Sequence, residues 1–255
     1  MNGSQNNKAL YITGGGGLSK NALNISTLAS IVVASAGIKV IKHVSYEGSK
    51  KCTSALFLKE MGARVCTNIS ETEQDFEKYG IAFVEAQKEY VLDNLCPVLT
   101  MGCDIARFIG INNPDLAMSY LFELKNKGCN KAIVAVPTDE NFDEISLCSS
   151  TQIFELINEQ IKNYIVSPIE YTFEETEPIS LTGATPLYNI NLSQDILSGK
   201  IKDAKLDVLA FNVGVMLYIV GAAVNIQKGI MAAYHLIESG RALSKFEQLR
   251  RKKFC

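Results

Sequence analysis

Residues 10–17 read Leu-Tyr-Ile-Thr-Gly-Gly-Gly-Gly, and Asn-Ile-Ser-Thr follows at 24–27. The β-prone run Ala9–Ile12 ends in glycines, and a small-residue helix then opens at Asn24 or Ser26. Glycine has no Cβ, so the backbone can turn there and approach a ligand closely. Free N–H groups at the start of the following helix favour an anion. This order predicts a phosphate-binding loop, although four glycines also suit a flexible turn.

Composition bounds the class of protein. The chain has 255 residues, 47% of them hydrophobic and 20% charged, with a formal net charge of −2. This length and composition predict one α/β domain, or one with a small appendage. We place the domain at residues 8–250 and expect residues 1–7 to be disordered. The charge balance gives no reason to expect nucleic-acid binding. Seven scattered cysteines favour a reducing cytoplasm over a disulfide framework, and two distant histidines form no metal-ligand cluster.

The apolar stretch Val208–Val224 raises the question of a transmembrane helix. It is short for a spanning helix, and Asn212, Gly214 and Gly221 interrupt it. A helix that is apolar on all sides also fits the centre of an α/β domain. We therefore expect a buried core helix and no membrane partner. The N-terminus lacks the apolar run of a signal peptide.

Short β-prone runs alternate with helical patterns along the chain. The expected strands are Ala9–Ile12, Ile38–Lys42, Arg64–Cys66, Ile81–Val84 and Lys131–Val136, with an antiparallel pair at Gln152–Phe154 and Tyr164–Val166. The span Pro97–Asn113 is predicted to be irregular between helices at Tyr90–Leu95 and Pro114–Lys127. The alternation predicts an α/β fold with a mostly parallel central sheet flanked by helices.

Three loops at the expected carboxyl edge of this sheet carry the chemistry for a diphosphate. They contain, respectively, the glycine turn with Asn24, Ser26 and Thr27; the cations and hydroxyls Lys42, Ser49, Lys50, Lys51 and Ser54; and the acidic pair Asp143-Glu144. Magnesium binds through one or two carboxylates together with substrate phosphates. The three loops together predict a Mg²⁺–diphosphate site. Taken singly, the lysines read as surface charge and the acidic pair as a solvated helix start.

These residues carry a family resemblance. The family's phosphate loop Gly-Thr-Gly-Gly-Asp-Gly is matched by 12–17, its Asn-Ile-Ser-Thr stands at 24–27, and its Ala-Gly-Val-Lys-Val-x-Lys-His is matched by 36–43. Asp143-Glu-Ile-Ser146 continues the pattern. The chain resembles the anthranilate phosphoribosyltransferases, which are related to the pyrimidine nucleoside phosphorylases. The likeness extends from about Ala9 to Leu249.

The resemblance implies a site and a reaction. It implies that Ser26, Asp143 and Glu144 are Mg²⁺ ligands. It implies that phosphoribosyl pyrophosphate contacts Gly14, Gly15, Asn24, Thr27, Lys42, Ser49 and Ser54. In the family an amine displaces pyrophosphate from the ribose C1 through an oxocarbenium-like transition state. The enzyme orients both substrates and neutralises the leaving pyrophosphate.

Departures from the family pattern affect both substrates. In the lysine loop, Ser45, Tyr46 and Glu47 stand where the family has asparagine, arginine and serine. At ~5 Å and an effective dielectric of ~20, the Glu47 carboxylate would oppose a phosphate by roughly 3 kcal/mol. In the acceptor region, Lys88–Tyr90 replace paired histidines, and Gly102 or Cys103 falls near the anthranilate-binding arginine. Arg107 is a candidate substitute, and Gly16 replaces the aspartate of the glycine loop.

The family carries a helical segment before its glycine loop, whereas eleven residues precede Ile12 here. The resemblance therefore implies a reduced helical subdomain, with a remnant at about 88–127. The apolar region 97–124 is expected to contact a protein partner or a second copy in a homo-oligomer. The alternative is that this stretch folds back onto the sheet.

The leading hypothesis is a divergent transferase that moves a phosphoribosyl or other glycosyl group from a phosphorylated sugar, with Mg²⁺, to an acceptor other than anthranilate. One alternative is a catalytically inactive homologue that acts as a binding or complex-forming subunit. A nucleoside phosphorylase is the third hypothesis, weakened by the altered lysine loop.

Overall fold

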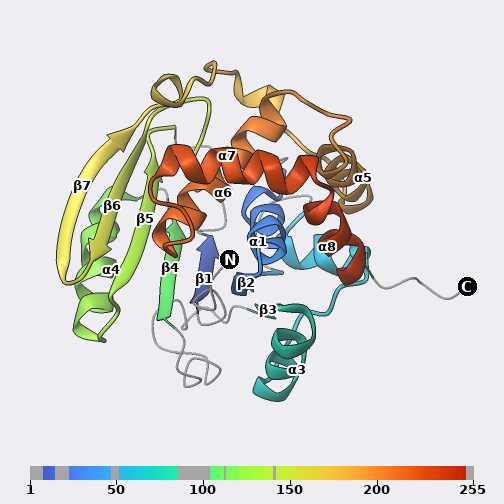
Figure 1. Ribbon diagram of the computed structural model, residues 1–255, viewed down its shortest axis with the longest axis horizontal. Coiled ribbons are helices and arrows are strands. Elements are labelled where there is room, and N and C mark those ends of the chain that lie inside the picture. The colour runs from blue at the N-terminus through green and yellow to red at the C-terminus, as the bar shows by residue number, and fades with distance from the viewer. Residues whose placement is uncertain are drawn as a thin grey trace, which may run out of the picture.

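A seven-stranded sheet runs through the centre of the computed structural model, which describes residues 8–14, 23–46, 52–85, 104–111, 113–139 and 142–250 (Figure 1). The strands are β1 (Lys8–Gly14), β2 (Lys39–Val44), β3 (Ile81–Glu85), β4 (Asp104–Gly110), β5 (Lys131–Pro137), β6 (Thr151–Ile157) and β7 (Gln160–Val166). Their order across the sheet is β3-β2-β1-β4-β5-β6-β7. Strands β1 to β5 are parallel, while β6 and β7 form an antiparallel hairpin at one edge.

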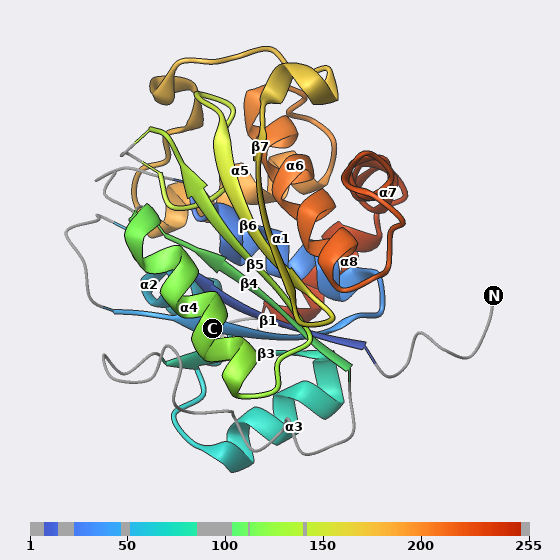
Figure 2. The ribbon, with the colours of Figure 1, turned by 90° about the vertical axis from the view of Figure 1, so that its left-hand side faces the viewer.

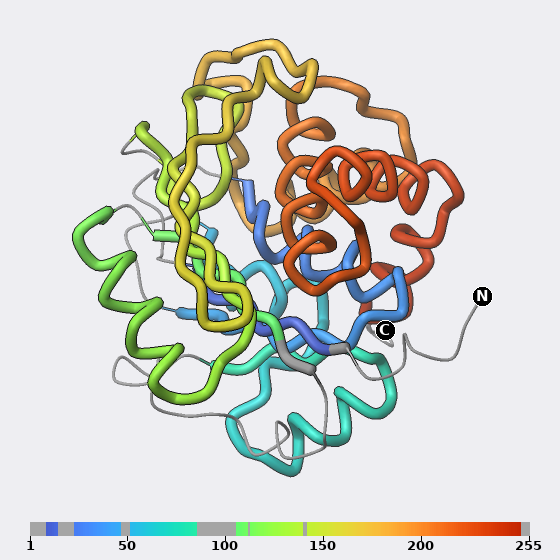
Figure 3. The backbone as a smooth tube through the Cα atoms, turned by 60° about the vertical axis from the view of Figure 1, so that its left-hand side comes forward, coloured from blue at the N-terminus to red at the C-terminus, as the bar shows by residue number. Residues whose placement is uncertain are grey.

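Helices cover both faces of the sheet (Figures 2 and 3). They are α1 (Ile25–Ser35), α2 (Ser54–Met61), α3 (Ile69–Tyr79), α4 (Pro114–Asn126), α5 (Pro186–Leu197), α6 (Ala204–Ile219), α7 (Ile226–Glu238) and α8 (Arg241–Leu249). Helices α1, α6, α7 and α8 lie on one face, with α2 packed against α5 beside them. Helices α3 and α4 lie on the other face. The expected α/β architecture is thereby confirmed.

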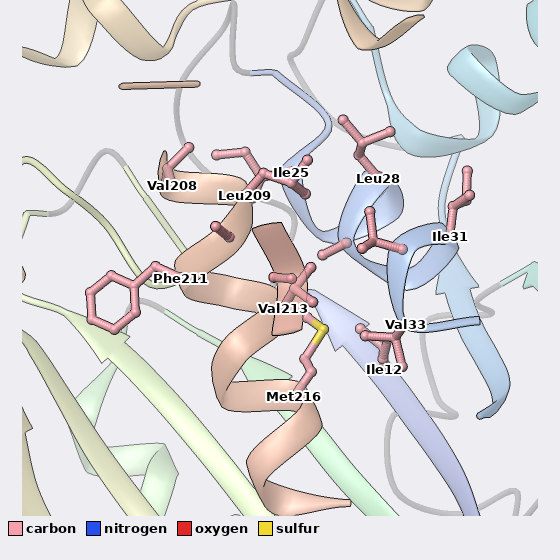
Figure 4. Close-up of a cluster of buried hydrophobic side chains, with 14 of the residues drawn as sticks. Ile12, Ile25, Leu28, Ile31, Val33, Val208, Leu209, Phe211, Val213 and Met216 are labelled. Atoms are coloured by element: carbon pink, nitrogen blue, oxygen red, sulfur yellow. The ribbon is translucent and has the colours of Figure 1, made fainter. Parts of the chain in front are cut away.

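The main core lies where α1 and α6 cross β1. Figure 4 shows Ile12, Val33, Val213 and Met216 pointing toward one another between these elements. All eleven residues of α1 are buried, and burying a side chain of valine or isoleucine size contributes about 1.5–3 kcal/mol. Helix α6 is also buried along nearly its whole length, so the prediction of a core helix is confirmed. Among the described helices, none combines the length and apolarity needed to cross a membrane.

Two expectations about strands were wrong. The span predicted to be irregular, Pro97–Asn113, contains β4, which lies between β1 and β5. Its pattern misleads because Ala106 and Phe108 face the α1 side while Arg107, on the opposite face, is buried as well. The expected strand Arg64–Cys66 makes only a single bridge, from Cys66 to Val84.

Candidate functional site

The candidate site lies at the carboxyl ends of β1 and β4. The chain leaves β1 toward β2 and β3 on one side, whereas β4 and β5 add on the other side. Such a reversal of strand order opens a crevice, where ligands bind in open α/β sheets. Gly14 and Gly110 end the two strands and are Cα partners. Both glycines therefore border the crevice.

Three predicted ligand residues converge on Gly14. A Cβ placed on Gly14 would lie 3.5 Å from Ser26 Oγ, 3.6 Å from Lys42 Nζ and 3.9 Å from Asp143 Oδ2. These groups come from α1, β2 and the loop after β5, and each of the three residues is buried. Ser26 and Asp143 thus lie well under about 10 Å apart, within reach of one shared Mg²⁺. The reading of the acidic pair as a solvated helix start is wrong.

The carboxylate of Glu144 meets the N-terminus of α1. Its Oε1 accepts a hydrogen bond from the Ser26 backbone N–H at 3.4 Å. A carboxylate is favoured here because the first N–H groups of a helix carry partial positive charge. The predicted anion-binding end of α1 therefore already contacts one of the protein's own anions. Thr27, also predicted to bind the donor, is buried in the first turn.

Two residues outside the predicted set hold the acidic loop in place. A Cβ at Gly110 would collide with the main chain of Asp143, coming 3.0 Å from its carbonyl carbon. Asn212, fully buried in α6, accepts a hydrogen bond from the Ile145 N–H at 3.2 Å and donates to the Ile145 carbonyl at 2.8 Å. The lone asparagine in an apolar helix was the sequence signal for this role.

The side chain of Asn24 connects three segments. Its Nδ2 donates to the Cys52 carbonyl at 3.2 Å, and its Oδ1 accepts from Asn189 Nδ2 of α5 at 3.0 Å. Asn189 is fully buried and also accepts from the Ala184 N–H at 2.7 Å. Asn24 therefore positions the start of α1, its expected contact with the donor stays a prediction, and sequence reasoning missed Asn189.

The other predicted donor-binding residues are placed as follows. Ser54, the first residue of α2, accepts a hydrogen bond from the Ser45 N–H at 3.2 Å and so fixes the chain leaving β2. Gly15, Ser49 and Glu47 lie outside the described residues.

Thr13 adds a donor and acceptor that the sequence reasoning did not consider. It precedes Gly14 at the end of β1 and is 4% exposed. Within the described part of the chain, its hydroxyl oxygen has no hydrogen-bond partner. Leaving a buried hydroxyl unpaired costs on the order of 1–3 kcal/mol. Because side chains alternate along a strand, Thr13 lies on the face of Tyr11, whereas the Gly14 contacts lie on the α1 side.

A buried polar cluster occupies the opposite face of β1, β2 and β4. The Tyr11 hydroxyl and His43 Nε2 are 2.5 Å apart, and the Arg107 guanidinium lies 4.7 Å above the Tyr11 ring. Burial lowers the pKa of His43 to about 4, with further lowering by the charges of Lys42 and Arg107. His43 is therefore neutral near pH 7. Arg107 is 6% exposed and packed against a ring.

The oxygen donors fit a magnesium ion whose remaining ligands come from a substrate. Asp143, Glu144 and the Ser26 hydroxyl are hard oxygen ligands, the type that Mg²⁺ prefers. Within the described ranges, no group of three or more His, Cys, Asp or Glu residues forms a metal cluster. One or two carboxylates suffice when phosphates supply the remaining ligands. The arrangement suits a metal–diphosphate complex better than an all-protein cage.

Residues 6–98 and 91–243 match the model of a family described as glycosyl transferase family, a/b domain. The chain belongs to this family. It is 32% identical over 253 residues to an anthranilate phosphoribosyltransferase of Desulfosudis oleivorans, covering 92% of this chain and 74% of the relative. A relative of the same name in Staphylococcus saprophyticus is 31% identical, with coverages of 94% and 76%. The resemblance to anthranilate phosphoribosyltransferases is thereby confirmed.

Solved structures show the same fold. The anthranilate phosphoribosyltransferase of Thermus thermophilus superposes with a TM-score of 0.77 at 24% identity, covering 95% of this chain and 77% of that one. The enzyme of Saccharomyces cerevisiae, in complex with phosphoribosyl pyrophosphate and Mg, gives a TM-score of 0.78 at 20% identity, with coverages of 96% and 76%.

Proposed function

We propose that this glycosyl transferase family member transfers a phosphoribosyl, or another glycosyl, group from a pyrophosphate donor to an acceptor other than anthranilate. The observation that carries the proposal is the convergence of Ser26, Lys42 and Asp143 on Gly14. The names of the relatives support the reaction class, and the yeast relative's complex supports the donor and Mg²⁺.

On the donor side, each group has a separate task. Asp143 and the Ser26 hydroxyl would hold Mg²⁺, which supplies positive charge against the leaving pyrophosphate. Lys42 Nζ offers a second cation to the phosphate oxygens. Gly14 leaves room for the donor because it has no side chain.

On the acceptor side, neither Arg107 nor His43 is a ready receptor for a carboxylate. Anthranilate carries a carboxylate, which an arginine with an accessible guanidinium would bind bidentately. Arg107 is buried over the Tyr11 ring, and His43 is neutral near pH 7 because its pKa is lowered to about 4. The two acceptor segments that depart from the family pattern, 88–90 and 102–103, lie outside the described residues.

Calorimetric titration with phosphoribosyl pyrophosphate, with and without Mg²⁺, tests the donor site. The sharpest variant is Gly14→Ala, because its Cβ makes only ordinary van der Waals contacts and the fold should tolerate it. The new methyl group occupies the point where the donor would sit. We expect at least a tenfold loss of affinity, with stability changed by less than about 0.5 kcal/mol.

Two further variants separate the metal from general charge effects. Asp143→Asn should abolish the Mg²⁺-dependent part of the affinity. Glu73→Gln removes a carboxylate from the exposed face of α3 and should leave binding unchanged. Failure of the wild-type chain to bind millimolar phosphoribosyl pyrophosphate under either condition would rule out the donor proposal.

That failure would favour the second candidate, an inactive homologue acting as a binding subunit. The contact between Glu144 and the Ser26 N–H supports this candidate, because a carboxylate already takes a donor that a phosphate would use. The carboxylate of Glu47 in the lysine loop also supports this candidate, because it would repel a phosphate. Glu47→Ser should then tighten the donor by up to about a hundredfold at low salt. An unchanged affinity would show that Glu47 points away from the donor.

A further inference from the structure

A second polar site lies on the hairpin edge of the sheet. Glu155 of β6 and Lys162 of β7 are Cα partners and share the face that packs toward α6. Glu155 is 6% exposed, and its Oε1 has no hydrogen-bond partner anywhere in the described ranges. A buried carboxylate is costly unless a cation or several donors compensate it. Tyr218 and Lys162 compensate the carboxylate only in part, and its Oε1 is left without a hydrogen bond.

This oxygen borders a hollow of about 250 Å³. The hollow is lined by Glu155, Ile157, Asn158, Gln160, Lys162 and Tyr218. An adjoining hollow shares Tyr218 and adds the rings of Tyr164 and Tyr171, together with Glu170. A carboxylate acceptor beside three phenol rings is the chemistry that recognises organic cations, because ring faces attract positive charge.

We propose that this hollow binds a small primary amine, whose ammonium group donates a hydrogen bond to Glu155 Oε1 while its apolar body lies against Tyr218. An ammonium carries three donors, so it can also reach the amide oxygens of Asn158 or Gln160. Two carboxylates and one lysine line the two neighbouring hollows, which favours a cation over an anion.

The pKa of Glu155 is consistent with an unfilled partner position. Burial raises the pKa of its carboxyl, and the interactions with Tyr218 and Lys162 offset this only in part. The other titratable groups around it are Tyr164 of β7 and, in the adjoining hollow, Tyr171 and Glu170. A bound ammonium would supply the missing positive charge.

This site is independent of the glycosyl transfer site. Ile157, which lines the hollow, pairs with Lys131 at the start of β5. The candidate transfer site lies at the opposite, carboxyl ends of β1 and β4. Failure of amine binding would therefore say nothing about the donor site.

Benzylamine is a suitable probe, titrated into the full chain and followed by NMR chemical shifts. Benzyl alcohol is the neutral control of similar shape. We expect benzylamine to saturate the site in the millimolar range and benzyl alcohol to bind at least tenfold more weakly. No saturation by about 10 mM benzylamine, or equal binding of the alcohol, would overturn the proposal.

Three variants complete the test. Glu155→Gln should weaken benzylamine at least tenfold, whereas Glu159→Gln removes an exposed carboxylate at the hairpin turn and should change nothing. Lys162→Gln removes the competing cation and should tighten benzylamine, so the proposal stays testable even if Glu155→Gln folds poorly. Unchanged affinity in both Glu155→Gln and Lys162→Gln would contradict it.

Discussion

Gly110 lies directly against the main chain of Asp143, with no room for a side chain between them. The contact lets the acidic loop reach over the end of β4 toward Gly14. We predict that Gly110→Ala pushes this loop away, costs about 1–3 kcal/mol of stability and lowers Mg²⁺-dependent donor affinity at least tenfold. Urea denaturation and calorimetric titration measure the two effects.

The matched control for Gly110→Ala is Ile109→Val, one position earlier in β4. It should cost about 0.5–1.5 kcal/mol through lost burial, with donor affinity unchanged. Equal loss of affinity in both variants would mean that reduced stability, rather than loop position, weakens binding.

Asn212 should prove to be a positioning residue for the acidic pair. Asn212→Leu keeps the apolar fit of α6 but leaves the N–H and carbonyl of Ile145 unpaired in a buried place. We expect a loss of about 2–5 kcal/mol and a weaker Mg²⁺ dependence of donor binding. Asn163→Leu, at an exposed position on β7, is the control and should stay within about 0.5 kcal/mol. A fully stable Asn212→Leu variant would refute this role.

His43 should make the fold sensitive to acid. Its pKa falls from 6.5 to about 4 on folding, so the unfolded chain binds the proton first as the pH drops. Stability should therefore decline by about 3 kcal/mol between pH 6.5 and pH 4 from this residue alone. His43→Gln should remove that part of the decline in urea denaturation, whereas His235→Gln, on the exposed face of α7, should not. Identical pH profiles for wild type and His43→Gln would contradict the assignment.

The interface expected through residues 97–124 stays a prediction. In its described part, Ala117 and Leu121 pack onto the sheet, while Leu116 and Phe122 are 44% and 52% exposed. If a second copy covers α4, sedimentation velocity at tens of micromolar should show a dimer that Phe122→Glu disperses. Leu187→Glu changes an equally exposed apolar residue on α5 and should leave the dimer intact. A monomeric wild-type chain would exclude self-association.

The sequence predicted the elements whose signals are local. The strand over Ala9–Ile12, the small residues of α1 and the buried run of β5 each follow from composition and spacing. Strand β4 was missed because Arg107 is buried on one face while apolar residues cover the other, so no alternation remains to be read. A buried arginine is rare without a partner, and here the Tyr11 ring supplies one.

The residues of the candidate site also fall into those that the sequence predicted and those that it did not. The chemistry of three loops at the sheet's carboxyl edge, and then the family motifs, brought Ser26, Lys42 and Asp143 into the prediction before any contact between them was visible. Gly110 and Asn189 were missed because their roles depend on close approach across the fold, which leaves no pattern in a single sequence. The motif that places Asn24 at the donor says nothing of its hydrogen-bond partner 165 positions away.

The separation of 165 residues between Asn24 and Asn189 also affects folding during synthesis. Asn24 must wait for Asn189, and at about 5–20 residues per second that delay is roughly 10–30 s. Helix α6, which covers much of the apolar surface of α1, emerges later still. During this interval α1 has translated neighbours in β1 and β2 but lacks its final cover, so the nascent chain presents an unshielded apolar helix to the cell's chaperones. Helix α1, which is synthesised early, is therefore among the last parts of the molecule to be fully buried.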